Sequence, residues 1–377
     1  MDILFLEEDA CAADLLPFTS TRSVLDIRMG ILTFREKWER LLGPAGFRLI
    51  APAATSAQPP QPASADPVPT GTALPANLLP TPETAAWIRE ALKQGPLTPA
   101  AAKDILSQST LIQYPWFIFL HNAEALIADF TLLTAGRKTQ PIPASVQAIS
   151  PEGIFIEEGA RLQHCLLNAS AGPIYIGRNA EIMEGSLIRG PFAACEGATV
   201  KMGTKIYGAT TLGPHSTAGG EIKNVVFFGY SNKGHDGYLG DSVIGEWCNL
   251  GAGTSASNLK NTASDVKVWH PASGRYTNAG LKCGLLMADY SRSAINTSFN
   301  TGTVVGVCCN VFGETIPPKY IPDFSWGAHH RYEWDNALRD IGNWKKLKNQ
   351  SLNDREINTL KHIFEPSQNG ITGQKPL

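Results

Sequence analysis

Several features that mark common classes of protein are scarce or missing in this sequence. It has no long run of basic residues, and 32 Lys and Arg against 34 Asp and Glu leave a formal net charge of -2. A dedicated nucleic-acid surface needs clustered cations that displace counterions from phosphates, so nucleic acid is not an expected partner. No apolar run reaches the roughly 18 residues of a membrane-spanning helix, so no membrane partner is expected either.

Cysteine pairs are missing as well. The seven cysteines are odd in number and form no CxxC pair, which argues against a disulfide framework and against a structural zinc site. We therefore expect small buried thiols in a reducing compartment. The N-terminus, MDILFLEEDACAADLLP, has acidic residues where a secretory signal peptide has a basic head. These features predict a cytoplasmic protein, and 377 residues suffice for two or three domains.

The first 140 residues have the pattern of an α/β domain. Residues 2–6 form a short apolar run that suits a buried strand. Thr33 and Glu36 form a capping box, which predicts a helix at about 35–42. Residues 51–75 are rich in Ala and Pro and cannot bury enough apolar surface to become ordered, so we expect an exposed linker or loop there.

Further helices are predicted before residue 140. Thr81-Pro82 and Thr98-Pro99 each place a capping side chain before a proline at the first helical position. The aromatic stretch 114–130 predicts the helix that closes this domain.

From residue 176 the sequence divides into hexapeptides. The first place of each is aliphatic and the fifth is mostly small, over eight consecutive units in one phase. A fixed short period of this kind predicts a solenoid of stacked parallel strands at 141–325. The phase is lost at 225–238 and again at 256–280, so two loops are expected to leave the solenoid. The first places are Ile176, Ile182, Ile188, Ala194, Val200, Ile206, Leu212 and Ala218.

The last 52 residues, 326–377, predict a helical tail. Trp334, Leu338 and Ile341 fall on one helical face. Asn353 with Glu356 forms a second capping box before another apolar stripe.

A histidine lies where the repeat is first interrupted, in the segment 221–258. The segment reads E-x-K, then G-H-x-x-Y-L-G-D, then I-G, and then N-x-G-A-G-T with an asparagine four places after the threonine. The hexapeptides resemble those of the hexapeptide-repeat acyltransferases. Within them, the segment is similar to the acetyltransferase half of the bifunctional glucosamine-1-phosphate acetyltransferase and N-acetylglucosamine-1-phosphate uridylyltransferase family. That resemblance implies a left-handed parallel β-helix, a homotrimer and acetyl-CoA as co-substrate.

The resemblance also implies roles for individual residues. His235 takes the place of the catalytic base and Ala252 that of a backbone position next to acetyl-CoA. Lys205 takes the place of an arginine that binds the phosphate, and it keeps the charge but not the bidentate fork. A tyrosine usual after the second asparagine is replaced here by Leu259, and the loop that follows is longer. The implied sugar-phosphate contacts are Lys223, Tyr238, Asn249 and Asn258.

Acetyl transfer to an amine needs a proton acceptor and a donor to the tetrahedral oxyanion. Histidine can take the proton near neutral pH, and a carboxylate can fix its tautomer. Glu221 is the candidate for that role and Asp236 the alternative. The oxyanion donor would be a backbone N–H in the turn Gly251 to Gly253.

Plainer interpretations of the same residues stay open. His235 could be a loop histidine without a role, and Tyr238 could be a packing aromatic. Asn249 and Asn258 could be turn residues whose amides satisfy the backbone.

The first domain resembles the sugar-phosphate nucleotidyltransferases more weakly. Arg22, Arg28 and Lys37 lie at about the spacing at which that family holds nucleotide phosphates. They could equally be solvated charges or a degenerate phosphate pocket. The glycine-rich GxGTRM loop of that family is absent, and the domain is short. No metal cluster is evident in the sequence, and Mg²⁺ is expected only if nucleotidyl transfer occurs.

The fold class expected is therefore a truncated α/β nucleotidyltransferase-like domain, then a left-handed parallel β-helix, then a short helical tail. The expected activity is acetyl-CoA-dependent N-acetylation of an amino-sugar phosphate, with glucosamine 1-phosphate as the acceptor, in UDP-N-acetylglucosamine synthesis. The alternatives are uridylyl transfer by the first domain and a non-catalytic trimeric scaffold.

Overall fold

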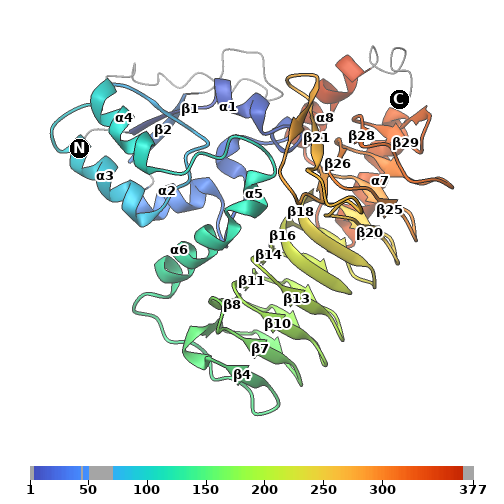
Figure 1. Ribbon diagram of the computed structural model, residues 1–377, viewed down its shortest axis with the longest axis horizontal. Helices are drawn as coiled ribbons and strands as arrows, with labels where there is room; N and C mark the ends of the chain where they lie inside the picture. The colour runs from blue at the N-terminus through green and yellow to red at the C-terminus, as the bar shows by residue number, and fades with distance from the viewer. Residues whose placement is uncertain (1–3, 44–45, 51–70, 368–377) are drawn as a thin grey trace.

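The computed structural model describes residues 4–43, 46–50 and 71–367. An α/β region lies against one flank of a parallel β-solenoid, and the chain enters the solenoid at the end far from that region (Figure 1). None of the described helices is long and apolar enough to cross a membrane.

The N-terminal region is a small three-stranded parallel sheet of order β2-β1-β3 with helices around it. The strands are β1 (Leu4–Glu7), β2 (Phe47–Ile50) and β3 (Leu74–Pro75). The helices are α1 (Asp9–Asp14), α2 (Phe34–Leu42), α3 (Pro82–Leu92), α4 (Pro99–Gln108), α5 (Phe117–Leu120) and α6 (Asn122–Thr134), with short 3-10 turns at Phe18–Ser20 and Val24–Asp26. Most of the predicted Ala/Pro-rich linker, at 51–70, lies outside the described residues.

The helix starts predicted from the sequence are confirmed. Thr33 Oγ1 accepts from Glu36 N, and the Glu36 carboxylate accepts from Thr33 N. Thr81 and Thr98 cap α3 and α4 through their hydroxyls, which accept from Thr84 N and Ala101 N, and each helix has proline in its first turn. These local devices do not depend on tertiary contacts, which is why the sequence alone reveals them.

The aromatic stretch after residue 114 forms two helices rather than one. The break falls at His121, where the backbone leaves helical geometry. The next residue, Asn122, is fully buried, and its amide donates to Ala209 O and Thr211 Oγ1 and accepts from Gly30 N. The three hydrogen bonds of the buried Asn122 amide stabilise the fold more than one unbroken helix would.

The solenoid has three faces. Two of them belong to one 15-stranded sheet: β4 (Gln147–Ile149), β7 (Leu166–Asn168), β10 (Leu187–Arg189), β13 (Lys205–Tyr207), β20 (Ser255–Ala256) and β25 (Ser298–Phe299) on one face, and β5 (Ile154–Ile156), β8 (Ile174–Ile176), β11 (Phe192–Ala194), β14 (Thr210–Leu212), β23 (Leu285–Met287), β26 (Thr303–Val305) and β28 (Tyr320–Ile321) on the other. β16 (Glu221–Gly229) and β18 (Tyr238–Glu246) bend around the shared corner and serve both faces. We call the first the site face and the second the covered face.

The third face is a separate ten-stranded sheet. Its strands are β6 (Arg161–Leu162), β9 (Glu181–Ile182), β12 (Thr199–Val200), β15 (Thr217–Ala218), β17 (Asn232–Lys233), β19 (Asn249–Leu250), β24 (Arg292–Ser293), β27 (Asn310–Val311), β29 (Ser325–Trp326) and β30 (His330–Arg331). The parallel solenoid expected from the hexapeptides is thus confirmed. All eight first-place residues of the hexapeptides are buried in its interior.

The first of the two expected loops, at 225–238, does not leave the solenoid, so that prediction is wrong. Strands continue through 221–246 on every face, and the coil there is shorter by three residues, because Val200 pairs with Ala218 but Ala218 pairs with Lys233. The phase is therefore shifted, with Phe227, Lys233 and Leu239 six apart and all fully buried. The repeat was not recognised here because Lys233 occupies a place that is aliphatic in the other hexapeptides.

The second interruption does leave the solenoid. Residues 256–280 carry an antiparallel hairpin of β21 (Lys267–His270) and β22 (Arg275–Asn278). Val266 and Val268 share one buried core with the N-terminal region and with covered-face residues such as Val226 and Val243. The insertion thus helps to join the two parts of the molecule.

The tail closes the upper end of the solenoid. α7 (Trp334–Lys346) and α8 (Asp354–Ser367) pack an apolar cluster against Trp247, Tyr290 and Phe324. The Asn353 and Glu356 capping box is confirmed by two reciprocal bonds of 2.9 and 3.0 Å. All seven cysteines are free and buried, as expected.

Candidate functional site

The site face presents two outward columns of polar side chains. In the first column, Lys205 pairs with Glu221, and Glu221 pairs with Tyr238. In the second, Tyr207 pairs with Lys223, and Lys223 pairs with Gly240. Strand alternation turns the intervening Ile206, Ile222 and Leu239 into the core. The fold therefore gathers Lys205, Glu221, Lys223 and Tyr238, which the sequence analysis singled out, on one solvent-facing surface.

Glu221 is held by a tyrosine of the preceding rung. Tyr207 Oη donates to Glu221 Oε1 at 2.6 Å, and this bond raises the pKa of Tyr207 to about 12. The ammonium of Lys223 lies 5.9 Å from the centre of the Tyr207 ring. The two lysines, Lys205 and Lys223, are thus placed one rung apart with a fixed carboxylate between them.

Tyr238 lies flat over a glycine. A Cβ on Gly240 would come within 2.3 Å of the Tyr238 hydroxyl oxygen, so only glycine leaves room for the ring. Asn258 Nδ2 donates to Tyr238 Oη at 3.0 Å and also to Asp241. Asp241 accepts in addition from Asn224 Nδ2 at 2.8 Å. Burial raises the pKa of Tyr238, so its hydroxyl stays protonated and can donate to a ligand.

His235 lies at the corner between the third face and the site face. It is exposed on the turn between β17 and β18. This turn is held from below by Lys233, whose buried ammonium donates to the carbonyl oxygens of His235 at 2.5 Å and Asp236 at 3.0 Å. Lys233 stands in an interior place where the neighbouring rung has Ala218. The backbone that carries His235 is therefore fixed by an internal charge.

A groove of about 520 Å³ runs along this corner past His235. It is lined by the corresponding turns of successive rungs, which are mostly glycine and short side chains. The lining residues are Met183, Lys201, Met202, Gly219, Gly220, Gly234, His235, Asp236, Ala252 and Gly253. The predicted base and the predicted acetyl-CoA positions Ala252 and Gly253 thus line a single groove.

The turn at Gly251 to Gly253 offers one backbone donor to this groove. Gly251 N donates to Ser293 O and Gly253 N donates to Asp236 O, both at 3.1 Å. Thr254 N donates back to Gly251 O. The Ala252 N–H is the remaining donor, and no acceptor for it is found in the described part of the chain. It meets the requirement for an oxyanion donor better than either glycine N–H.

The expected orientation of His235 by Glu221 is not found. The Glu221 carboxylate accepts from Tyr207 instead, on the site face rather than at the corner. Within the described ranges no hydrogen bond joins the His235 ring to Glu221 or to Asp236. The physical reason is strand alternation, which turns the Glu221 side chain onto the open face one rung below Tyr238.

Asn249 does not join the other residues. It lies on β19 of the third face, where it pairs with Asn232 and Arg292. Tyr238 and Asn258 lie on the site face, beyond the corner. Sequence spacing places Asn249 near His235 along the chain, but the corner turns its strand to a different side.

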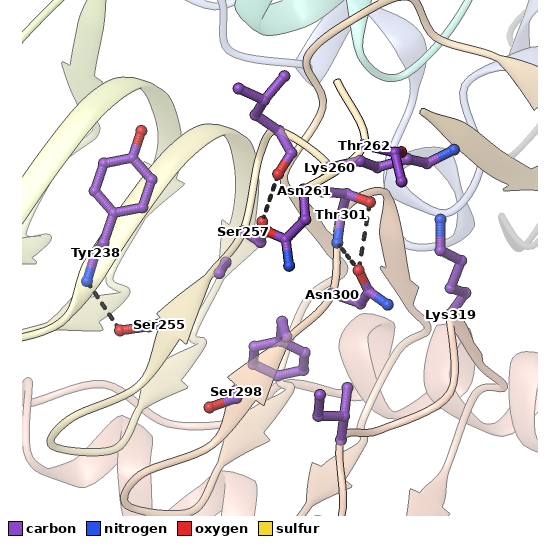
Figure 2. Close-up of a pocket in the computed structure, with 14 residues that line it drawn as sticks. Tyr238, Ser255, Ser257, Lys260, Asn261, Thr262, Ser298, Asn300, Thr301 and Lys319 are labelled. Carbon is purple, nitrogen blue, oxygen red and sulfur yellow. Dashed lines mark hydrogen bonds between the residues drawn. The ribbon is translucent and has the colours of Figure 1, made fainter. Parts of the chain in front are cut away.

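A second cavity, of about 650 Å³, opens on the site face beyond Tyr238 (Figure 2). Tyr238 N donates to Ser255 Oγ at 3.1 Å at one end of it. Lys260 and Lys319 lie at the other end, with Asn261 and Asn300 between (Figure 2). This cavity adjoins the polar columns but not the corner groove.

The three predicted nucleotide-binding cations have other partners. Arg22 pairs with Asp289 and lies 3.3 Å from Glu246, both on the solenoid. Arg28 Nε donates to Phe228 O at 3.0 Å.

Lys37 is 1% exposed and bonds to the buried carboxylate of Asp129. An enclosed ammonium cannot reach a nucleotide, so Lys37 has to be removed from that candidate site. Arg22 and Arg28 join the N-terminal region to the solenoid.

Comparison with known proteins finds similarity to sugar nucleotidyl transferases and to bifunctional GlmU proteins. A model of the sugar nucleotidyl transferase family matches residues 3–103. The bifunctional protein GlmU of Methanocaldococcus jannaschii is 34% identical over 89 residues, which are 24% of this chain and 21% of that protein. The chain resembles a divergent GlmU. Similar too is the bifunctional sugar-1-phosphate nucleotidylyltransferase/acetyltransferase of Sulfurisphaera tokodaii, 33% identical over 92 residues, or 24% of this chain and 23% of that protein.

A longer match is to the bifunctional protein GlmU of Cyanothece sp., 25% identical over 183 residues, 43% of this chain and 39% of that protein. The chain thus spans less than a quarter of the two archaeal relatives and about two fifths of the cyanobacterial one. Among solved structures, the UDP-N-acetylglucosamine acyltransferase from Campylobacter jejuni is 12% identical with a TM-score of 0.28, covering 60% of this chain and 96% of that chain.

Several residues of the site were missed by the sequence analysis. Tyr207 and Asp241 were missed because their partners become neighbours only through strand pairing. Lys260 and Lys319 come together across 59 positions of sequence, which no local spacing reveals. Lys233 could have been found, since it is six residues from both Phe227 and Leu239 in the shifted hexapeptide phase.

Proposed function

We propose that this protein transfers an acetyl group from acetyl-CoA to the amine of an amino-sugar phosphate, with glucosamine 1-phosphate as the acceptor. The observation that supports it most is the corner groove, where His235 and Ala252, whose N–H has no acceptor among the described residues, line one cavity beside the cationic site face. The resemblance to bifunctional GlmU proteins agrees with this chemistry. The pathway would then be UDP-N-acetylglucosamine synthesis in the cytoplasm.

The chemistry follows from these positions. His235, as the neutral imidazole, takes a proton from the acceptor amine as the amine attacks the thioester carbonyl. The Ala252 N–H donates to the oxyanion of the tetrahedral adduct. The adduct then expels the coenzyme A thiolate, which takes up the proton held by His235. The C–N bond formed balances the C–S bond broken, and no oxidant or metal is needed.

The site face supplies the acceptor contacts. Lys205 and Lys223 carry the positive charge that a sugar phosphate requires, and Tyr238 and Asn258 offer hydrogen bonds to the sugar. Asn249 lies on the third face rather than on the site face, so we propose that it contacts a ligand held by a neighbouring copy. The homotrimer implied by the resemblance would allow such sharing, and we include it in the proposal.

Substituting His235 tests the proposal. We expect His235→Ala to lower kcat for acetyl transfer to glucosamine 1-phosphate by about 10²-fold or more, the usual worth of a general base. Coenzyme A release is followed by thiol titration across a panel of amino-sugar phosphates. His164→Ala, an exposed histidine near the entry to the solenoid, is the matched control and should keep full activity.

Two results would refute this proposal. One is an unchanged rate in His235→Ala. The other is a wild-type protein that consumes no acetyl-CoA with any member of the panel and shows no thermal shift with coenzyme A, which would favour the scaffold interpretation.

A second candidate function is uridylyl transfer by the N-terminal region. The family match over residues 3–103 favours it. That chemistry would need Mg²⁺, and within the described residues no three His, Cys, Asp or Glu side chains gather where they could hold a metal ion. Mg²⁺ is commonly held by one or two carboxylates together with substrate phosphates, so uridylyl transfer would not require such a cluster. Pyrophosphate release from UTP and a sugar phosphate would establish this activity.

A further inference from the structure

The cavity in Figure 2 is chemically asymmetric. Fourteen residues line it, and the charged ones among them are two lysines, Lys260 and Lys319. Its apolar wall is made by Ala256, Leu259, Phe299 and Ile316, and its remaining lining carries hydroxyl and amide side chains. Neither lysine lies in an ion pair with a carboxylate in the part of the chain that the structure describes.

The two ammonium groups have only neutral partners. Lys260 Nζ donates to the carbonyl oxygen of Asp265, and Lys319 Nζ donates to that of Lys267 at 3.2 Å. Each ammonium has three donors, so two on each remain for a ligand. Burial lowers the pKa of Lys319, and repulsion from Lys260 lowers it further. An anion between them would relieve this repulsion.

Neutral donors surround the same end of the cavity. Asn300 Oδ1 accepts from Thr301 N at 2.8 Å, which fixes the amide and leaves its nitrogen free to donate. Asn261 and Thr262 come from the insertion and lie beside Lys260 (Figure 2). Positive charge with several convergent donors is the arrangement that a phosphate group requires.

We propose that Lys260 and Lys319 form an anion subsite that binds a phosphate group of a substrate, distinct from the Lys205 and Lys223 pair. The proposal rests on the proposed function, because it takes the ligand of this cavity to be a substrate of the acetyl transfer. The cavity begins at Tyr238, the residue proposed to contact the sugar, and ends at the two lysines. The phosphate belongs either to the sugar acceptor or to coenzyme A.

The inserted segment accounts for the subsite. Lys260 follows Leu259, and both belong to the start of the insertion. Lys319 comes from the segment that leads into β28. The insertion therefore brings a cation to the site face in addition to its hairpin contact with the N-terminal region.

Calorimetric titration of the full chain tests the subsite without relying on turnover. The probes are glucosamine 1-phosphate and coenzyme A, each titrated separately into wild type, Lys260→Met with Lys319→Met, and the control Lys282→Met. Lys282 is exposed just after the insertion and lies outside the cavity. We expect the double variant to bind one probe about tenfold more weakly, and the control to bind as wild type does. Circular dichroism confirms that the variants are folded.

The probe that is affected identifies the source of the phosphate. Weaker binding of glucosamine 1-phosphate alone assigns the subsite to the acceptor, and weaker binding of coenzyme A alone assigns it to the acetyl donor. Equal binding of both probes by wild type and the double variant overturns the proposal. So does wild type that binds neither probe. If wild type binds the probes but transfers no acetyl group in an assay, the proposed function is wrong. The anion subsite is then unaffected, because the titration measures binding and not turnover.

Discussion

Lys233 shows how one residue inside the solenoid controls a residue on its surface. It occupies an interior column between Ala218 and the next rung, and it is fully buried. Its ammonium reaches the carbonyl oxygens of His235 and Asp236, so the corner that carries the proposed base is tied to the core. A buried charge costs stability unless it is well bonded, which suggests that its position serves the site.

The pH dependence of stability should reveal this charge. Burial lowers the pKa of Lys233 to about 8 from its usual 10.5. Between these values the unfolded chain binds more protons than the folded chain, so the free energy of unfolding contributed by this group rises with pH. We expect the stability of wild type relative to Lys233→Met to increase from pH 8 to pH 10, measured by urea unfolding. An unchanged difference across that window would show that Lys233 keeps its proton.

The same variant should impair turnover more than binding. Without the ammonium, the two carbonyls lose their donor and the corner at His235 is no longer fixed. We expect a lower kcat with a nearly unchanged KM for acetyl-CoA. Lys233→Arg, which keeps the donors, is the matched control.

At the scale of elements, α6 fixes the loop at residues 30–32 and links it to helix α2 and to the solenoid. Asp129 of α6 accepts from Ile31 N at 2.7 Å and from Leu32 N at 3.0 Å, and it pairs with Lys37 of α2. Asn122 of the same helix bonds to the solenoid. One short helix thus connects a loop, a neighbouring helix and the covered face.

Removing the Asp129 charge should therefore be costly. Asp129→Asn leaves Lys37 buried without its carboxylate, and breaking a buried pair in this way costs about 3–5 kcal/mol. Glu90→Gln is the control, because it breaks the exposed Lys93–Glu90 pair, whose loss should cost under about 1 kcal/mol. Both values come from chemical unfolding at pH 7. Equal costs for the two variants would contradict the assignment of Asp129 as a buried anchor.

At the scale of the whole molecule, the N-terminal region and the solenoid share one continuous apolar core. Leu4, Phe18 and Trp38 belong to the same buried cluster as Val226 and Val243 of the covered face. Arg22 adds a polar connection, since Asp289 of the solenoid accepts from Arg22 and from Thr21 Oγ1. The two parts should therefore unfold together.

Arg22→Ala separates a structural role from a nucleotide-binding role. The change leaves Asp289 buried without its cation, so we expect a loss of about 3–5 kcal/mol in the free energy of unfolding. A double-mutant cycle with Asp289→Ala should give a large coupling energy. If Arg22→Ala instead abolished pyrophosphate release from UTP while stability stayed unchanged, Arg22 would be a ligand contact and the structural interpretation would be wrong.

Much of the site could be predicted from the sequence, because its residues follow a repeat. The motifs E-x-K and G-H-x-x-Y singled out Glu221, Lys223 and Tyr238, and strand pairing in the solenoid brings these three residues to one face. The same spacing failed for Asn249, because a corner intervenes. It also failed for Glu221 as the partner of His235, since the Glu221 carboxylate accepts from Tyr207 of the preceding rung.

The sequence by itself determined what is local and periodic: the helix caps and the hexapeptide solenoid. The tertiary structure decided what depends on residues far apart in the chain. It turned Lys37 into a buried anchor, directed the insertion onto the N-terminal region and brought Lys260 to Lys319. The reason is physical. A cap or a repeat depends on residues a few positions away in the sequence, whereas the partners of a charged side chain are set by the tertiary packing around it.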